Sequence, residues 1–148
     1  MTLRRSLAFA AGVIFSSSLQ ASDLVPFDVW NKENPKWQLR ELDSAYVFTR
    51  CGALIFSIGV FLERNSDGGK STGISRSNIQ RGSNLSLRAI PLYKKNGVTG
   101  EFVEMRTKAL MDAYYGKMQE NTVIHNRFLY GFTLSDLKFC EEVESLAR

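Results

Sequence analysis

Residues 51–62 are apolar on every face that a helix could present. Before and within this range, apolar residues recur at steps of three, four and seven positions, which is helical spacing: Leu39, Leu42, Tyr46, Ala53, Phe56 and Val60. A helix that is apolar all round lies either in the centre of a protein or in a membrane. The sequence therefore predicts a central helix at about 35–63. It would begin at Asn34-Pro35, where asparagine can cap and proline suits the first helical position.

The N-terminal segment, residues 1–21, has the pattern of a cleavable signal peptide. Two arginines precede a short apolar run over residues 7–15, and three serines and Leu19-Gln20-Ala21 follow. This order of charged, apolar and small regions is typical of an export signal. The apolar run is too short to span roughly 30 Å of hydrocarbon. We therefore expect cleavage after Ala21, a single domain at 22–148, and a periplasmic or secreted protein of the bacterial envelope.

Two other kinds of leader share parts of this pattern. The pair Arg4-Arg5 also occurs in twin-arginine signals, and an Arg- and Ser-rich segment without acids is typical of mitochondrial presequences. The ordinary secretory signal fits best, because all three of its regions are present in the right order. Removing residues 1–21 lowers the net charge of the chain from +4 to +2, so the mature protein is only weakly basic.

Cys51 and Cys140 are the only cysteines in the chain. In an oxidising compartment an isolated pair most simply forms one disulfide. Closing a loop of about 90 residues stabilises a fold by roughly 4–5 kcal/mol in the chain-entropy model. That is comparable with the whole net stability of a small domain. We therefore predict a Cys51–Cys140 disulfide that ties the C-terminal helix to the central one.

The remaining segments predict a small helical bundle. Residues 64–83 are rich in Gly and Ser without apolar periodicity, which indicates a flexible loop. The following stretch around Pro91 fits a short helix or packed coil. Apolar residues at helical spacing then predict helices at about 101–120 and from Thr133 onward. The expected fold class is all-α, with three to four helices, a long basic loop and one disulfide.

No motif predicts a metal or cofactor site. Gly69-Lys70-Ser71-Thr72 resembles the end of a phosphate-binding loop, but the glycine that the pattern needs is replaced by Arg64. One histidine and two cysteines are too few for a standard zinc site. We therefore expect no cofactor and no metal.

His125 is the one candidate for acid–base chemistry. It is the only histidine, and a carboxylate such as Glu104 or Glu120 would have to orient it. A Cys–His nucleophile pair would require a free cysteine, which the expected disulfide removes. An enzyme that uses His125 with a carboxylate is therefore an alternative to a binding protein rather than the leading hypothesis.

Positive charge is concentrated in residues 64–95. This range has a net charge of +6, whereas the rest of the mature chain sums to −4. The imbalance predicts an anionic partner, such as an envelope protein, a polysaccharide or lipid headgroups. The alternative is that the segment folds against the protein's own acidic helices or only aids solubility. The candidate contact residues are Arg64, Lys70, Arg76, Arg81, Arg88, Lys94 and Lys95.

These features favour a non-enzymatic binding protein. No nucleic acid is expected as a partner, because Tyr93 is the only aromatic residue in the basic range on which a base could stack. A single-span inner-membrane protein crossing at 45–62 is a further alternative. Arg50 would then cost up to roughly 2.5–3.5 kcal/mol near the middle of the bilayer. The sequence does not indicate an oligomeric state.

Overall fold

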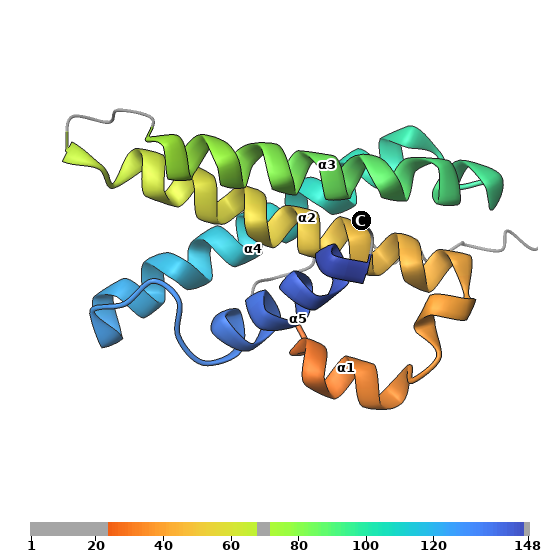
Figure 1. Cartoon of the computed structure of the whole chain (residues 1–148), viewed down its shortest axis with the longest axis horizontal. Coiled ribbons are helices and arrows are strands. Elements are labelled where there is room, and N and C mark those ends of the chain that lie inside the picture. Colours follow the sequence, from red (N-terminus) through yellow and green to blue (C-terminus); the bar gives the residue numbers. More distant parts are fainter. Residues whose placement is uncertain (1–23, 68–71, 147–148) are drawn as a thin grey trace, which may run out of the picture.

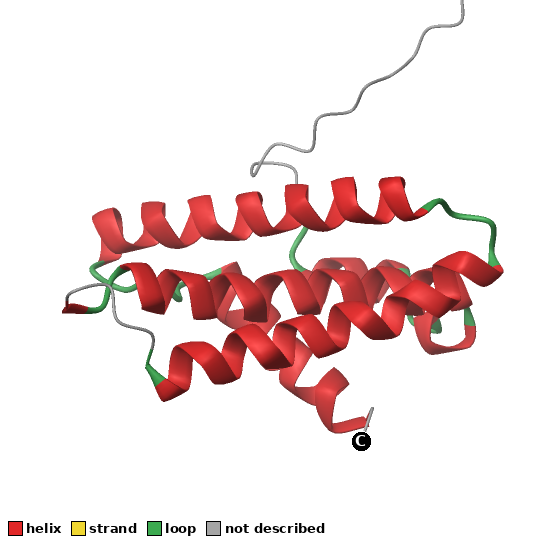
Figure 2. Ribbon diagram, turned by 90° about the horizontal axis from the view of Figure 1, so that it is seen from above, coloured by secondary structure: helices red, strands yellow, loops and turns green. Residues whose placement is uncertain are grey.

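The computed structural model describes residues 24–67 and 72–146 (Figure 1). It contains five α-helices and one turn of 3-10 helix: α1 (Phe27–Glu33), η2 (Trp37–Leu39), α2 (Glu41–Arg64), α3 (Gly73–Lys95), α4 (Gly100–His125) and α5 (Phe132–Leu146). No strand is present in these two ranges (Figure 2). The all-α fold class is confirmed, although the helix count exceeds the expected three to four. The predicted signal peptide at 1–21 lies outside the described residues.

The central element is α2, which contacts η2, α3, α4 and α5. In the view of Figure 1, α3 runs beside α2 on one side, and α5 and α1 lie on the other. Within the described ranges, α2 is also the one helix long and apolar enough to cross a bilayer. The core helix of a soluble protein meets the same criterion, and 72% of the most apolar window of α2 is buried inside the molecule.

The start of the central helix differs from the prediction. Asn34 ends α1 instead of beginning the next helix, because its backbone N–H and its side-chain Nδ2 both donate to the carbonyl oxygen of Trp30, each at 3.0 Å. Pro35 follows this end, where proline is common because it cannot continue a helix. The long helix begins only after Arg40, whose backbone is extended.

The predicted flexible loop at 64–83 is wrong from residue 73 onward, because Gly73–Lys95 forms one continuous helix, α3. Thr72 and Ser75 start it with a capping box. The Thr72 side chain accepts from the Ser75 N–H at 3.0 Å, and the Ser75 hydroxyl accepts from the Thr72 N–H at 2.9 Å. The expected short helix or coil around Pro91 is the second half of this longer helix.

Close packing explains why a Gly- and Ser-rich segment is helical here. A Cβ atom added to Gly82 would lie 2.4 Å from the backbone nitrogen of Phe56, and one added to Gly52 would lie 2.7 Å from the Gly82 carbonyl oxygen. A Cβ atom on Gly59 would lie 2.7 Å from the carbonyl oxygen of Ser75. Since glycine has no side chain, the backbones of α2 and α3 can touch. The glycines therefore belong to a helix–helix contact.

Gly82→Ala is expected to lower the free energy of unfolding by about 1–3 kcal/mol, because the added methyl group forces the two backbones apart. Gly116→Ala is the matched control: it also lies inside a helix, but its Cβ atom would meet no atom within 4 Å. This control should stabilise the protein by about 0.5–1 kcal/mol. Urea unfolding of the oxidised protein measures both, and equal effects would contradict the close α2–α3 contact.

Candidate functional site

A buried ion pair joins the central helix to the last helix. Arg50 of α2 and Asp136 of α5 are fully buried, and Arg50 Nη2 lies 2.6 Å from Asp136 Oδ2. The Tyr114 hydroxyl of α4 accepts from Arg50 Nε at 2.7 Å and donates to Asp136 Oδ2 at 2.6 Å. The backbone N–H of Phe27 in α1 donates to Asp136 Oδ1 at 2.7 Å. Four of the five helices therefore meet at one carboxylate.

Burial governs the ionisation of this cluster. Desolvation raises the pKa of Tyr114 well above its ordinary value, although the neighbouring Arg50 charge works against the shift. Desolvation alone would lower the pKa of Arg50, but Tyr114, Tyr46 and Asp136 outweigh it and the pKa is raised overall, so the guanidinium stays charged. The charged groups are paired inside the protein and closed to solvent. The cluster therefore holds the helices together and offers no reactive group to a substrate.

The raised pKa of Tyr114 predicts loss of stability at alkaline pH. An unfolded tyrosine loses its proton near pH 10, whereas folded Tyr114 keeps it. The contribution of Tyr114 to the free energy of unfolding is therefore fully present below about pH 10. Above that pH it should fall by about 1.4 kcal/mol per pH unit. Tyr114→Phe should remove this component. It should also cost about 1–3 kcal/mol at pH 7, because Arg50 Nε loses its acceptor.

Urea unfolding at a series of pH values between about 8 and 11 measures this effect. Tyr130→Phe is the control, because Tyr130 is 46% exposed and lies outside the buried cluster. It should keep the alkaline slope of the wild type. An unchanged slope in Tyr114→Phe would show that another group causes the alkaline loss.

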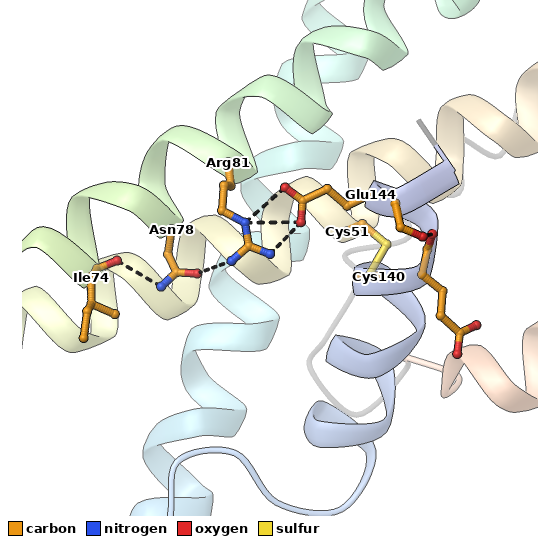
Figure 3. Close-up of polar contacts among 8 residues, drawn as sticks. Cys51, Ile74, Asn78, Arg81, Cys140 and Glu144 are labelled. Carbon is orange, nitrogen blue, oxygen red and sulfur yellow. Dashed lines mark hydrogen bonds and ion pairs between the residues drawn. A yellow bond between two sulfur atoms is a disulfide. The ribbon is translucent and has the colours of Figure 1, made fainter. Parts of the chain in front are cut away.

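The predicted Cys51–Cys140 disulfide is confirmed, with Cα atoms 5.3 Å apart (Figure 3). Both cysteines are buried. Cys51 follows Arg50 directly on α2, and Cys140 lies about one helical turn after Asp136 on α5. The ion pair and the disulfide therefore fasten the same stretch of α5 to the same stretch of α2. No thiol is left for catalysis, since the chain has no other cysteine.

Two of the predicted anion-contact residues are paired with the protein's own acids. Arg81 bonds to Glu144 of α5, with Nη2–Oε2 at 2.5 Å and Nε–Oε1 at 3.1 Å (Figure 3). Lys95 pairs with Glu41 at the start of α2. Because they are fourteen residues apart, Arg81 and Lys95 lie on the same side of α3. That side of the helix faces acidic side chains of the same molecule.

The other predicted contact residues are spread over the molecule. Arg76, Arg88 and Lys94 are exposed on α3. Arg64 ends α2, and its guanidinium carbon lies 5.3 Å from the centre of the Tyr115 ring. Lys70 lies outside the described residues.

The side chain of His125 makes no hydrogen bond or ion pair to another described residue. It is exposed at the end of α4, and its ring stacks on Tyr130 with 3.9 Å between the ring centres. Glu104 lies 21 residues earlier on the same helix, which places it about 31 Å away along the axis. Glu120 pairs with Lys117. The described residues also contain no cluster of three or more metal-ligating side chains.

An open groove of about 810 Å³ lies between α3 and α4. Its apolar lining comes mainly from Phe56 of α2, Leu87, Ile90 and Tyr93 of α3, and Val103 and Met111 of α4. Leu87 is 60% exposed and Ile90 47% exposed, so the groove is open to solvent. A smaller hollow of about 230 Å³ adjoins it at Phe56 and Met111 and reaches Arg64.

The groove arises because α3 carries two apolar stripes. Leu85 and Ala89 are buried, whereas Leu87 and Ile90 lie on another side of the helix and line the groove. This second stripe was not predicted from the sequence. Its signal is the three-residue step from Leu87 to Ile90, which is informative only once the segment is known to be helical.

Comparisons with protein-family models, curated proteins and solved structures find no match to this chain. Function is therefore inferred from the geometry of the molecule. The groove has a volume within the range of about 300–1,000 Å³ that ligand-binding clefts occupy, and its lining is mostly apolar with a few polar groups. It is the candidate functional site.

Proposed function

We propose that this chain is an exported, non-enzymatic binding protein of the bacterial envelope that holds its partner in the groove between α3 and α4. The observation that carries the proposal is the exposure of Leu87 and Ile90 on the wall of an apolar groove. Apolar side chains that gather in an open hollow leave water favourably when a partner covers them.

Export is supported by the disulfide and by the N-terminal sequence. Disulfides persist in oxidising compartments such as the bacterial periplasm and are rare in the cytosol. Residues 1–21 have the three regions of a secretory signal. Together they favour a periplasmic or secreted protein.

The charge of the groove supports an anionic partner. One wall belongs to the basic range 64–95 and contributes Lys94, and the other wall contributes Lys108 and Glu104. Lys108 pairs with Asp112 on its own helix, whereas Lys94 has no ion pair within the described ranges. An acidic group of the partner would therefore meet Lys94.

The surroundings of α2 support a core helix rather than a membrane span. Most of its apolar window is covered by other helices. Its mid-helix charge, Arg50, is neutralised by Asp136 of the same molecule. An arginine paired and covered in this way does not have to enter hydrocarbon.

Ile90→Asp is expected to abolish capture of the partner, because it places a charge on the apolar wall of the groove. Met105→Asp is the matched control: Met105 is 62% exposed on α4 but does not line the groove. The tagged full-length protein is expressed in a bacterial host, recovered from osmotic-shock fluid and used to capture envelope components. Thermal unfolding checks that both variants remain folded.

Retention of the same partner by Ile90→Asp would show that the groove is not the binding site. Recovery of the full chain only from the cytoplasm or the membrane pellet would contradict export to the periplasm.

A further inference from the structure

The length and walls of the groove match a single helix of a partner. α3 and α4 are joined by a short turn and run in opposite directions (Figure 1). Along α4, the two hollows extend from Gly100 to Tyr115, which is about 22 Å or four helical turns. A helix laid there would contact α2, α3 and α4 together and complete a four-helix bundle.

The open side of the groove favours an occupant with one polar face. Because Leu87 and Ile90 are exposed, the outer half of any bound molecule stays in water. An acyl chain has no polar face to turn outward, so much of its apolar surface would remain hydrated. An amphipathic helix buries its apolar stripe and keeps its polar side in solvent.

The helical walls also disfavour an extended peptide. An extended segment needs N–H and C=O partners for its backbone. Apart from the Leu87 carbonyl, whose helical donor is missing because residue 91 is proline, the backbone groups inside α3 and α4 are used along these helices. A helix satisfies its own backbone groups and needs only side-chain contacts from the groove.

Charge in the groove specifies one further feature of the partner. Lys108 lines the groove but pairs with Asp112 on its own helix, so Glu104 is the one acid of the lining that has no ion pair in the described ranges. Lys94 stands on the α3 wall without an ion pair in the described ranges. A carboxylate on the partner helix would supply the missing opposite charge.

We infer that the groove binds one amphipathic α-helix of a partner protein, with apolar residues at positions i, i+3, i+4 and i+7 and an acidic residue against Lys94. This inference rests on the proposed function and names the kind of segment that the groove takes. The partner is a protein segment, not a lipid or a second copy of this chain.

The test is selection of random 16-residue peptides displayed on phage against the oxidised full-length protein. The enriched peptides should share the helical apolar spacing and an acidic residue, and should gain helical circular dichroism on binding. Ile90→Asp should weaken their binding by about 30-fold or more, as for a central contact residue, whereas Met105→Asp should not.

A charge exchange tests the contact with Lys94. Lys94→Glu should weaken the selected peptides about 2- to 5-fold, the range for an exposed ion pair. A peptide with lysine in place of its acidic residue should recover that loss on Lys94→Glu. Arg76→Glu, on an exposed position of α3 that does not line the groove, is the control and should bind the original peptide as the wild type does.

Several results would overturn the inference. Enriched peptides without helical spacing, or no enrichment, would exclude a helical occupant. Binding of oleate or of anionic phospholipid vesicles that is lost in Ile90→Asp, without peptide binding, would assign the groove to a lipid. A wild-type dimer in sedimentation that Ile90→Asp dissociates would assign it to a second copy. In the lipid and dimer cases the groove remains a binding site, so the helical occupant is refuted but the proposed site is not. Selected peptides that bind Ile90→Asp equally well would refute the proposed site itself.

Discussion

Asp136→Ala is expected to lower the free energy of unfolding by about 3–5 kcal/mol, because it leaves the Arg50 charge buried without a partner. The same change removes the acceptor of the Phe27 N–H and so loosens α1. The net stability of a domain is typically about 5–15 kcal/mol, so this variant should lose a large share of it. Urea unfolding measures the loss, and hydrogen exchange of residues 27–33 measures the loosening of α1.

Two further variants make this result specific. Arg50→Met combined with Asp136→Leu removes both charges and should recover much of the loss, since apolar residues of similar volume can replace a buried ion pair. Glu144→Ala breaks the Arg81–Glu144 pair, which is partly exposed, and should cost at most about 1 kcal/mol. If Asp136→Ala lowers the free energy of unfolding by no more than Glu144→Ala does, the buried ion pair is not a main contribution to the stability of the fold.

Removing the disulfide should have an effect of similar size. Cys51→Ala/Cys140→Ala is expected to lower the free energy of unfolding by about 4–5 kcal/mol, because the unfolded chain regains the freedom of a loop closed over 89 positions. Reduction of the wild type should produce a loss of the same size in urea unfolding. Rapid reaction of both cysteines of the native, unreduced protein with a thiol reagent would contradict the bridge.

The two ties should not act independently. The Arg50–Asp136 pair and the disulfide hold neighbouring residues of α5 against neighbouring residues of α2. Once either interaction is lost, α5 is partly released from α2, and the remaining interaction then stabilises less native structure. Asp136→Ala and reduction of the disulfide together should therefore lower the free energy of unfolding by less than the sum of the two separate losses.

The sequence was sufficient for the features that follow from strong periodicity and from simple counting. The apolar run from Cys51 to Leu62 predicts a buried helix, and α2 is that helix. The segment after Gly100 and the one after Gly131 are helices near the predicted positions. Two cysteines in a chain with a secretory leader pattern predict one bridge, and it is present.

The predictions were wrong where one residue type serves two purposes. Glycines and serines between 64 and 83 are typical of loops, yet Gly82 and Ser75 permit close contact with α2. That purpose is visible only when the partner helix is considered, because Gly52 and Gly59 stand seven residues apart on α2 and face this segment. The predicted helix start at Asn34-Pro35 is wrong for a similar reason, since asparagine can end one helix as well as begin another.

The candidate site was harder to predict than the fold. Charge alone assigned the contact to residues 64–95, but Arg81 and Lys95 bind acids of α5 and α2. Pairing across helices depends on packing that no local pattern reveals. The buried ion pair had a usable signal: Arg50 precedes Cys51, Asp136 lies one turn before Cys140, and the expected disulfide already placed these two stretches in contact.

The position of the disulfide gives the chain a ring topology. Cys51 and Cys140 close residues 51–140 into a covalent circle that contains the whole of α3 and α4, whereas α1 lies outside it. A single proteolytic nick at residues 96–99 would open the circle without separating the pieces, so non-reducing electrophoresis would show one band of unchanged mass. A nick at residues 34–36 would instead detach the segment that carries α1, which noncovalent contacts alone retain.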